Sequence, residues 1–506
     1  MKSKNLLILI TFIFSIFISA NLFANSFADT FGMSAEGMAR GNAMTASVND
    51  WSAVYYNVAG LGKTPVFGGA AKDSEMTLKL RKTEGEASSN AEQKYPNQFG
   101  LGVMYTFPQL KLNITRFGTT SGGDLVPIPT KAADMDPYGF ITVGGVINLN
   151  SFFQLPDFIS TARLGIATCL NSDFSLTKVN DLDPRTHNFL RYGREVQHAM
   201  IIIGAAMGLL NDAIGGGVGA NVQFSGKAKN LQELLLTADP QIPVSQATMD
   251  LIIAPGAVAG IYISPGKIFN TIDGLEIGAS YRMETKLKIN PFDVSASILG
   301  GVINMNLMLS IHDYYSPHTV TTGIAYTFFG LTASLDINYE MWSKIGYNKV
   351  NEAHYFGKPK FKDILVWKGG IKYDTPLTWL TVMAGYSYLP SIIAKNAGTT
   401  YGIRLGTTQN LLQTGMYNMM DNIKHIAALG LKFNIPKMGS MGGVAYITLT
   451  YQFQYLVPMS VSKNGFSIDI GTGAQDPALL SAYLLNPSYS FGGMNHTIFA
   501  EIGMRI

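Results

Sequence analysis

Cysteine and charge are both scarce in this chain of 506 residues. Cys169 is the only cysteine, so neither an internal disulfide nor a zinc cluster or redox pair built from cysteines can form. Only 14% of the residues are charged. The 37 basic residues nearly match the 34 acidic ones, and no basic patch stands out, which argues against nucleic-acid binding.

Long apolar runs are also missing beyond the first 24 residues. The longest, Ala199–Leu210, contains two glycines and falls short of the roughly 20 residues that a spanning helix needs. The N-terminus differs, because Lys2 and Lys4 precede the apolar stretch Leu6–Ala20 and a small residue follows at Ala24. This layout predicts a secretory signal peptide over residues 1–24 and an exported mature protein.

The mature chain also lacks internal boundaries. A soluble chain of this length would normally divide into several domains, yet no Pro/Ser-rich linker or charge run interrupts it. We therefore expect one continuous architecture over residues 64–506.

What the chain does contain is alternation with a period of two. In Leu331–Met341 the odd positions are apolar, and the even ones are Thr, Ser, Asp, Asn and Glu. Such a strand presents one face to an apolar environment and the other to a polar one. Because charges on the lipid face of a membrane barrel are costly, the even face should point into a lumen.

The same pattern extends over most of the chain. It recurs in Leu275–Met283 and in Gly443–Tyr455, and runs of about 9 to 11 residues suit membrane strands. Eleven further segments complete a set of fourteen candidates: Val66–Arg81, Tyr138–Leu149, Thr161–Leu170, Val196–Leu209, Ile214–Phe224, Leu251–Ile263, Val302–Thr327, Ile364–Tyr373, Trp379–Leu389, Ile423–Ile435 and Asn495–Ile506. The prediction is an all-β, antiparallel transmembrane barrel of about 14 strands. The extended region Gln98–Phe117 leaves 16 open, and alternation alone also fits a soluble sandwich.

One stretch lacks the alternation expected of a barrel strand. Phe31–Lys63 is rich in Gly and Ala, alternates poorly, and holds too few apolar side chains to form a core alone. We predict that residues 25–63 form a hatch, meaning a plug enclosed by the barrel.

This stretch resembles the N-terminal hatch of the FadL family, outer-membrane transport proteins for long-chain fatty acids and other hydrophobic molecules. The resemblance rests on Gly37–Ala43, on Asp50, and on Asn57-Val58-Ala59-Gly60, where Val58 replaces the proline of the family pattern. Four wall segments are similar to family motifs in the same order: Gly274–Arg282, Pro317–Gly323, Gly369–Tyr373 and Ala384–Tyr388.

The resemblance implies passive uptake of hydrophobic molecules such as long-chain fatty acids, or aromatic hydrocarbons, in the bacterial outer membrane. It implies capture at apolar outer loops, movement of the hatch and lateral release through the wall, without a cofactor or metal. Expected partners are the hydrophobic ligand, outer-membrane lipids and the barrel assembly machinery, and the expected state is a monomer. A general porin for small polar solutes and a structural or adhesive surface barrel are the alternatives.

Candidate site residues fall into a gate and a capture region. The gate comprises Asn57, Val58, Ala59 and Gly60 in the hatch. Two apolar segments between strands are candidate ligand sites: the exposed patch in Ser151–Ile159 and a predicted short amphipathic helix over Asn230–Leu236. Their proposed ligand-binding residues are Phe152, Phe153, Leu155, Phe158, Leu231, Leu234, Leu235 and Leu236. The inward Arg282 could bind a fatty-acid carboxylate, or else pair with acidic residues and the hatch.

Enzyme signatures are absent from the sequence. None of the seven histidines has the H-E-x-x-H spacing, and there is no G-x-S-x-G elbow. Gly215–Gly219 lacks the Lys-Ser/Thr that would complete a phosphate loop. The prediction is a protein that is not an enzyme, although an inward Ser and His on neighbouring strands would leave no such motif in the sequence.

Overall fold

The computed structural model describes part of the chain. The described residues are 27–64, 97–119, 125–131, 136–171, 188–189, 191–192, 200–234, 245–269, 272–286, 292–298, 303–309, 315–344, 355–356, 361–377, 379–393, 401–405, 409–413, 419–438, 443–461, 466–469 and 489–505. The predicted signal peptide lies outside them.

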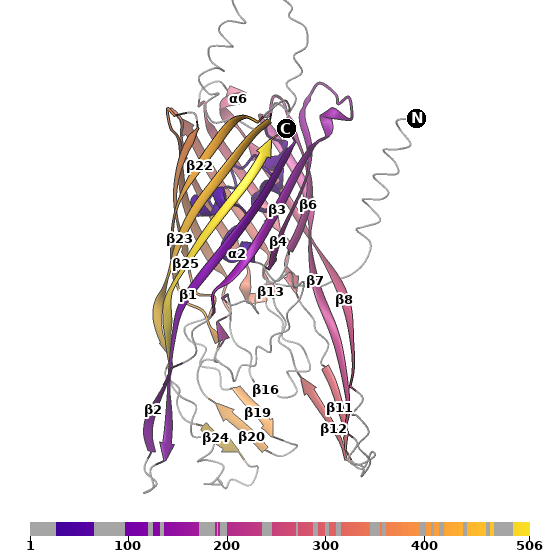
Figure 1. Cartoon of the computed structure of the whole chain (residues 1–506), viewed down its shortest axis with the longest axis vertical. Coiled ribbons are helices and arrows are strands. Elements are labelled where there is room, and N and C mark those ends of the chain that lie inside the picture. The colour runs from indigo at the N-terminus through magenta and orange to yellow at the C-terminus, as the bar shows by residue number, and fades with distance from the viewer. Residues whose placement is uncertain are drawn as a thin grey trace, which may run out of the picture.

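The described chain forms a closed barrel of 14 antiparallel strands (Figure 1). In wall order the strands are β1 (Gln98–Thr119), β3 (Tyr138–Asn148), β4 (Ile159–Asn171), β6 (Met200–Leu209), β7 (Ile214–Leu234), β8 (Ser245–Ile263), β9 (Leu275–Arg282), β14 (Thr319–Phe328), β15 (Leu331–Glu340), β17 (Ile364–Asp374), β18 (Leu380–Leu389), β22 (Lys424–Met438), β23 (Gly443–Val461) and β25 (Tyr489–Arg505). The first strand pairs with the last, from Gln98↔Arg505 to Ile114↔Tyr489. Closure leaves no exposed strand edge in the wall.

The predicted strand number is confirmed, but one member of the set differs. The first wall strand, β1, covers the extended region Gln98–Phe117, which was not among the fourteen predicted strands. The predicted strand Val66–Arg81 lies outside the described residues. The long candidate Val302–Thr327 contains a separate strand, β12 (Ile303–Leu309), and the wall strand β14 begins only at Thr319.

The predicted strand faces are also confirmed. In β15 the even residues from Thr332 to Asn338 are buried, and Ala333, Leu335 and Tyr339 are exposed on the outside. The polar face of the strand therefore points into the lumen, and the apolar face points outward to lipid.

The two ends of the barrel differ in the length of their connections (Figure 1). At one end the turns are short, as at Phe329 and Gly330 between β14 and β15. At the other end long connections join the strands, and the β7–β8 hairpin extends beyond the wall. Short turns of such barrels face the periplasm, so the long connections mark the outer end.

Further strands lie in the connections. Hairpins or small sheets are formed by β2 (Leu125–Lys131), β5 (Asn188–Phe189), β10 (Thr285–Lys286), β11 (Phe292–Ile298), β12, β13 (Tyr315–Ser316), β16 (Tyr355–Phe356), β19 (Tyr401–Leu405), β20 (Gln409–Gln413), β21 (Met419–Met420) and β24 (Phe466–Asp469). Short helical turns occur at η2 (Leu149–Ser151), α6 (Pro265–Phe269) and η3 (Trp342–Lys344).

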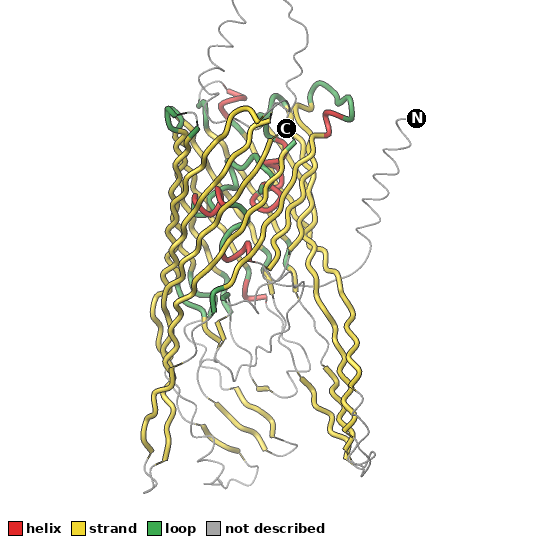
Figure 2. Tube along the Cα trace, in the orientation of Figure 1, coloured by secondary structure: helices red, strands yellow, loops and turns green. Residues whose placement is uncertain are grey.

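Residues 27–64 fill the lumen, where Figure 2 shows their helices and loops inside the wall. They contain α2 (Phe27–Thr30), α3 (Ala35–Ala39), α4 (Ala53–Tyr56) and η1 (Val58–Gly62). Nearly every residue from Phe27 to Lys63 is buried. We use the name hatch for residues 27–64 from here on.

The predicted helix over Asn230–Leu236 is wrong for its described part. Residues 230–234 continue β7, and Asn230 and Leu231 lie opposite Ala247 and Gln246 of β8. Cross-strand hydrogen bonds satisfy the backbone here, so the pairing overrides the helical spacing of the leucines. Leu235 and Leu236 lie outside the described residues.

Within the described part of the chain, no helix is both long and apolar enough to cross a membrane. The same residues contain no group of three or more His, Cys, Asp or Glu placed to hold a metal ion.

Candidate functional site: the hatch and its contacts with the wall

The hatch runs the length of the lumen. Thr30 lies toward the outer end, where its carbonyl accepts from Gln454 Nε2 at 3.4 Å. Thr64 lies at the short-turn end, where its N–H donates to Asp212 in the β6–β7 turn at 2.9 Å. The predicted plug therefore obstructs the barrel from one end to the other.

Ionic contacts tie the centre of the hatch to the wall. Glu36 in α3 accepts from Lys432 of β22 at 2.8 Å, and Lys372 of β17 lies 3.3 Å away. Arg40 lies 3.5 Å from the same carboxylate. These groups are largely buried, and buried charges are stable only when they are paired.

The ends of the hatch have ion pairs of their own. Near the outer end Asp29 binds Arg282 of β9 at 2.7 Å, and Tyr55 donates a hydrogen bond to Asp29 at 2.8 Å. Near the other end Lys63 pairs with Glu276, also of β9, at 2.9 Å. Arg282 is therefore already paired with a carboxylate of the hatch. This favours a role in holding the hatch over a role in binding a fatty-acid carboxylate.

Other inward acidic groups are occupied in the same way. Asp336 of β15 accepts from the backbone N–H of Thr45 at 2.8 Å. Glu501 of β25 accepts from the N–H of Ala35 at 2.7 Å. Because these carboxylates bind hatch backbone, the polar inner face of the wall serves to hold the hatch in place.

The predicted gate residues form a close junction between hatch and wall. Asn57 is the N-cap of η1, and its side-chain oxygen accepts from the N–H of Ala59 at 3.2 Å. Its Nδ2 donates to the carbonyls of Thr45 at 2.8 Å and of Ile261 in β8 at 3.1 Å. One amide thus joins two hatch segments to the wall.

Val58 occupies the place of the proline in the family pattern and does not prevent the turn. It is the first residue of η1, a position that accepts proline as well as other residues because its N–H lacks an intrahelical partner. Its side chain and carbonyl pack against wall glycines: a Cβ on Gly204 or Gly217 would lie 2.5 Å from Val58 Cγ2 or 2.9 Å from its carbonyl oxygen. Glycine is required there because any side chain would push η1 off the wall.

The outer face of the same wall section carries an apolar groove of about 1090 Å³. Small residues form its floor: Gly216 and Gly217 of β7 and Ala259 and Gly260 of β8. Met207, Val218, Ile261, Tyr281 and Val320 form much of its exposed lining. Only the strand layer separates this groove from η1 inside.

The predicted Ser151–Ile159 patch lies beside this groove. Phe153 and Leu155 line it, and Phe152 and Phe158 are exposed. However, the patch follows β3, whose Val146 lies opposite Gln98 at the start of β1, so it sits at the short-turn end. It is therefore not an outer-loop capture site. The end of the barrel at which a turn lies depends on the strand register, which the sequence alone does not give.

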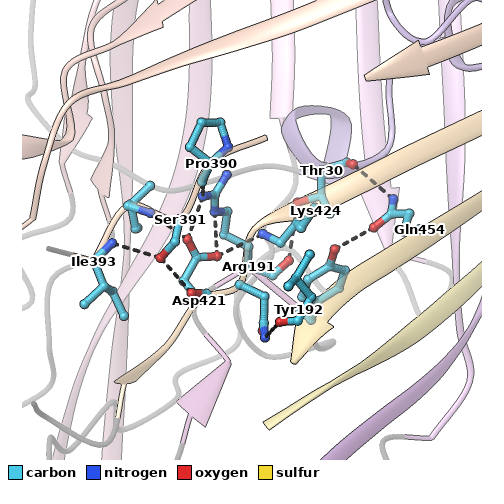
Figure 3. Close-up of polar contacts among 12 residues, drawn as sticks. Thr30, Arg191, Tyr192, Pro390, Ser391, Ile393, Asp421, Lys424 and Gln454 are labelled. Carbon is cyan, nitrogen blue, oxygen red and sulfur yellow. Dashed lines mark hydrogen bonds and ion pairs between the residues drawn. The ribbon is translucent and has the colours of Figure 1, made fainter. Parts of the chain in front are cut away.

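Nothing in the sequence indicated a buried cluster that lies between the hatch and the long connections at the outer end (Figure 3). Arg191 donates to both carboxylate oxygens of Asp421, at 3.0 and 2.7 Å, and Lys424 donates to Asp421 at 2.9 Å. Burial by itself raises the pKa of the Asp421 carboxyl, but Arg191 and Lys424 outweigh it and hold that pKa below its usual range. We call Arg191, Asp421 and Lys424 the outer latch.

The outer latch fixes segments that are far apart in sequence. Arg191 belongs to the connection between β4 and β6, and it also donates to the carbonyl of Pro390 at 3.0 Å. The neighbouring Tyr192 donates to Gln454 of β23 at 2.6 Å. The cavity between the latch and the hatch has a volume of about 40 Å³ and is lined by Asp29 and Arg282, among others. That space suits one or a few waters rather than a hydrocarbon chain.

Comparison with known proteins agrees with this architecture. No known family model and no curated protein matches the sequence. Among solved structures, a FadL homologue of Pseudomonas aeruginosa is similar with a TM-score of 0.52 at 11% identity, over 96% of this chain and 99% of that one. The toluene transporter TodX of Pseudomonas putida gives a TM-score of 0.43 at 14% identity, over 96% and 99% of the two chains.

The class of protein follows from the wall and its contents: this is a 14-stranded transmembrane β-barrel with an internal N-terminal hatch. More particularly, its fold is FadL-like.

Proposed function

We propose that this protein is a passive outer-membrane channel for hydrophobic small molecules, which leave the barrel sideways into the membrane beside η1. The sequence resemblance makes long-chain fatty acids and aromatic hydrocarbons the first ligands to test. The observation that carries the proposal is the thin wall section between η1 and the apolar groove.

The obstructed lumen supports this route. The cavity above the hatch is about 40 Å³, and the hatch is tied to polar wall groups down to Thr64. A steady aqueous path for polar solutes would require all of these ties to open. A lateral path requires that η1 moves away from the wall at Gly204 and Gly217 and that the pairing among β6, β7 and β8 opens locally.

The chemistry of the ligand favours the lateral exit. An apolar solute gains about 0.8 kcal/mol for each methylene group that it transfers from water to hydrocarbon. The groove lining is apolar and opens onto the lipid face, whereas the lumen wall presents carboxylates and cations. A hydrophobic ligand therefore has its lowest free energy on the outside of the wall.

Uptake through the groove can be tested by filling it. A Cβ on Gly216, which lines the groove, would meet only one atom within 4 Å, the Gly260 carbonyl oxygen at 3.8 Å. Gly216→Phe should therefore fold and narrow the groove. The expected result is severalfold slower uptake of labelled oleate and of toluene. Ala500→Phe, on the exposed face of β25 far from the groove in the strand order, is the matched control and should leave uptake unchanged.

Planar-bilayer recordings separate this proposal from its rivals. The wild-type protein should show little steady conductance, and large steady ion currents would identify a general porin instead. If deletion of the protein leaves uptake of both ligands unchanged, a structural or adhesive role replaces transport. If Gly216→Phe and the control transport equally well, the lateral route is wrong even if transport itself is real.

A further inference from the structure

Among the residues that the structure describes, three tyrosine–histidine pairs of the same geometry lie on the outward-facing side of the wall. The Tyr hydroxyl lies 2.8 Å from the His Nδ1 in Tyr281–His318. The distance is 2.6 Å in Tyr386–His425 and in Tyr451–His496. In each pair the tyrosine stands opposite the residue two positions after the histidine on the next strand, namely Val320, Ala427 and Ile498.

The three histidines stand at one level of the barrel. Each precedes a lipid-facing run by two residues, and the runs start at Val320, Ala427 and Ile498 and continue toward the short-turn end. The runs over 320–328 and 427–435 have nine residues each and the run over 498–504 has seven, against about 9 to 11 residues in a tilted membrane strand. The histidines therefore mark the edge of the apolar band on the side of the long connections, where lipid headgroups begin.

The pairs of His425 and His496 differ from the pair of His318 in the surroundings of the histidine. His318 Nε2 lies 3.5 Å from a Glu284 carboxylate oxygen, so that pair is closed by the protein itself. His425 and His496 have aromatic neighbours: Tyr388 lies 5.4 Å from the His425 ring, and Phe453 lies 5.3 Å from the His496 ring. Both histidines lie on the same side of their strands as the exposed Ala427 and Ile498, which is the outward side of β22 and β25.

We propose that His425 and His496 bind the phosphate groups of an outer-leaflet lipopolysaccharide. In this proposal the tyrosine hydroxyl is the donor to Nδ1, so that the proton stays on Nε2 and that nitrogen is the donor to phosphate. Phosphate oxygens are the strongest hydrogen-bond acceptors at this level of a membrane, and bonds to them are charge-assisted.

The spacing of the two histidines favours lipopolysaccharide over a phospholipid. They stand on β22 and β25, which flank β23, opposite Tyr455 and Phe453 of that strand, so about 10 Å across the strands and about 7 Å along them separate the two histidines. These strands form one continuous face of the wall in Figure 1. A headgroup with two phosphates on a disaccharide reaches both imidazoles, whereas a headgroup with a single phosphate reaches one.

The proposal can be tested by native mass spectrometry of the full-length protein titrated with purified lipopolysaccharide and, separately, with phosphatidylglycerol. His425→Phe/His496→Phe keeps the aromatic rings and removes both donors. Its affinity for lipopolysaccharide should fall more than about tenfold, because each lost bond to a charged group contributes that much or more. His318→Phe is the matched control and should change the affinity by less than about twofold, because Glu284 already occupies its outward nitrogen.

Three results would overturn the proposal. They are unchanged lipopolysaccharide binding in the double variant, an equal loss in His318→Phe, or an equal loss of phosphatidylglycerol binding. Folding of each variant is checked by its compact gel mobility before heating. Should the double variant fail to fold, Tyr386→Phe/Tyr451→Phe provides the second test: it keeps all rings, releases Nδ1 and should also weaken lipopolysaccharide binding.

Discussion

Replacing Glu36 by glutamine should loosen the hatch locally at α3, and the structure allows the size of the effect to be worked out. Of its three cationic partners, Arg40 keeps hydrogen bonds to Ser47 and Ser334. The side chain of Lys372 is 23% exposed and can reach water, whereas that of Lys432 is only 6% exposed. The cost therefore comes mainly from Lys432, which would lose its anionic partner while it remains buried.

Removing one partner of a buried pair costs about 3–5 kcal/mol. Glutamine keeps one acceptor oxygen, so the lower value of about 3 kcal/mol applies, which is a factor of about 100 in the local opening equilibrium. Hydrogen exchange followed by mass spectrometry should show this acceleration in peptides that cover Ala35–Ala39. Peptides that cover η1 (Val58–Gly62) should exchange as in the wild type, because the ties of Asn57 remain.

A double-mutant cycle provides the control for the Glu36 prediction. Lys432→Met alone should also destabilise α3, because it removes the closest cation from the Glu36 carboxylate. The double variant Glu36→Gln/Lys432→Met should be less affected than the sum of the two, because no unpaired charge of this pair remains buried. Additive effects, or unchanged exchange at α3 in Glu36→Gln, would refute the view that this pair seats the hatch.

Three further predictions concern the gate and the outer latch. Gly217→Val places side-chain atoms where the Val58 carbonyl lies and should displace η1, which planar-bilayer recording would show as increased leak; Gly216→Ala, on the outer face, should not leak. Val58→Pro is compatible with the first position of η1 and should stiffen the gate and slow ligand uptake; unchanged uptake would mean that the motif acts through Asn57 and Ala59 alone. Asp421 has a folded-state pKa below its usual value, so its contribution to stability is present above the unfolded-state pKa of about 4 and is lost as the pH falls through the lower folded value. The protection of peptides that contain Arg191, measured relative to the intrinsic exchange rate at each pH, should therefore fall on acidification in the wild type and already be low near neutral pH in Asp421→Asn. An acid response that survives Asp421→Asn would assign it to another group.

The sequence predicted the wall well because the wall obeys a local rule. In β15 and β23 each residue faces lipid or lumen according to its place in a two-residue period, and the environment of each face selects the side chain. The number of strands followed from the same rule. Which extended segments belong to the wall did not follow from it, because the sequence of an extended segment shows the same pattern in the wall and in an outer hairpin.

The prediction for Asn230–Leu236 failed for a related reason. Leucines at positions 231, 234 and 235 fit a helical face. However, β8 pairs with β7 as far as Gln232 and β11 pairs with it up to Leu234, and this pairing makes the extended form more favourable. Short apolar segments carry too little periodicity to decide between helix and strand, and the neighbouring chain decides instead.

The sequence by itself determined that a chain of alternating strands surrounds a glycine- and alanine-rich segment, because face selection and small-residue composition are properties of single segments. Only the tertiary structure decided which groups hold that segment. Glu36 meets Lys432 across 396 positions of sequence, and Asn57 meets Ile261 across 204. Such contacts depend on barrel closure and strand register, and these bring together residues whose relation no local pattern records.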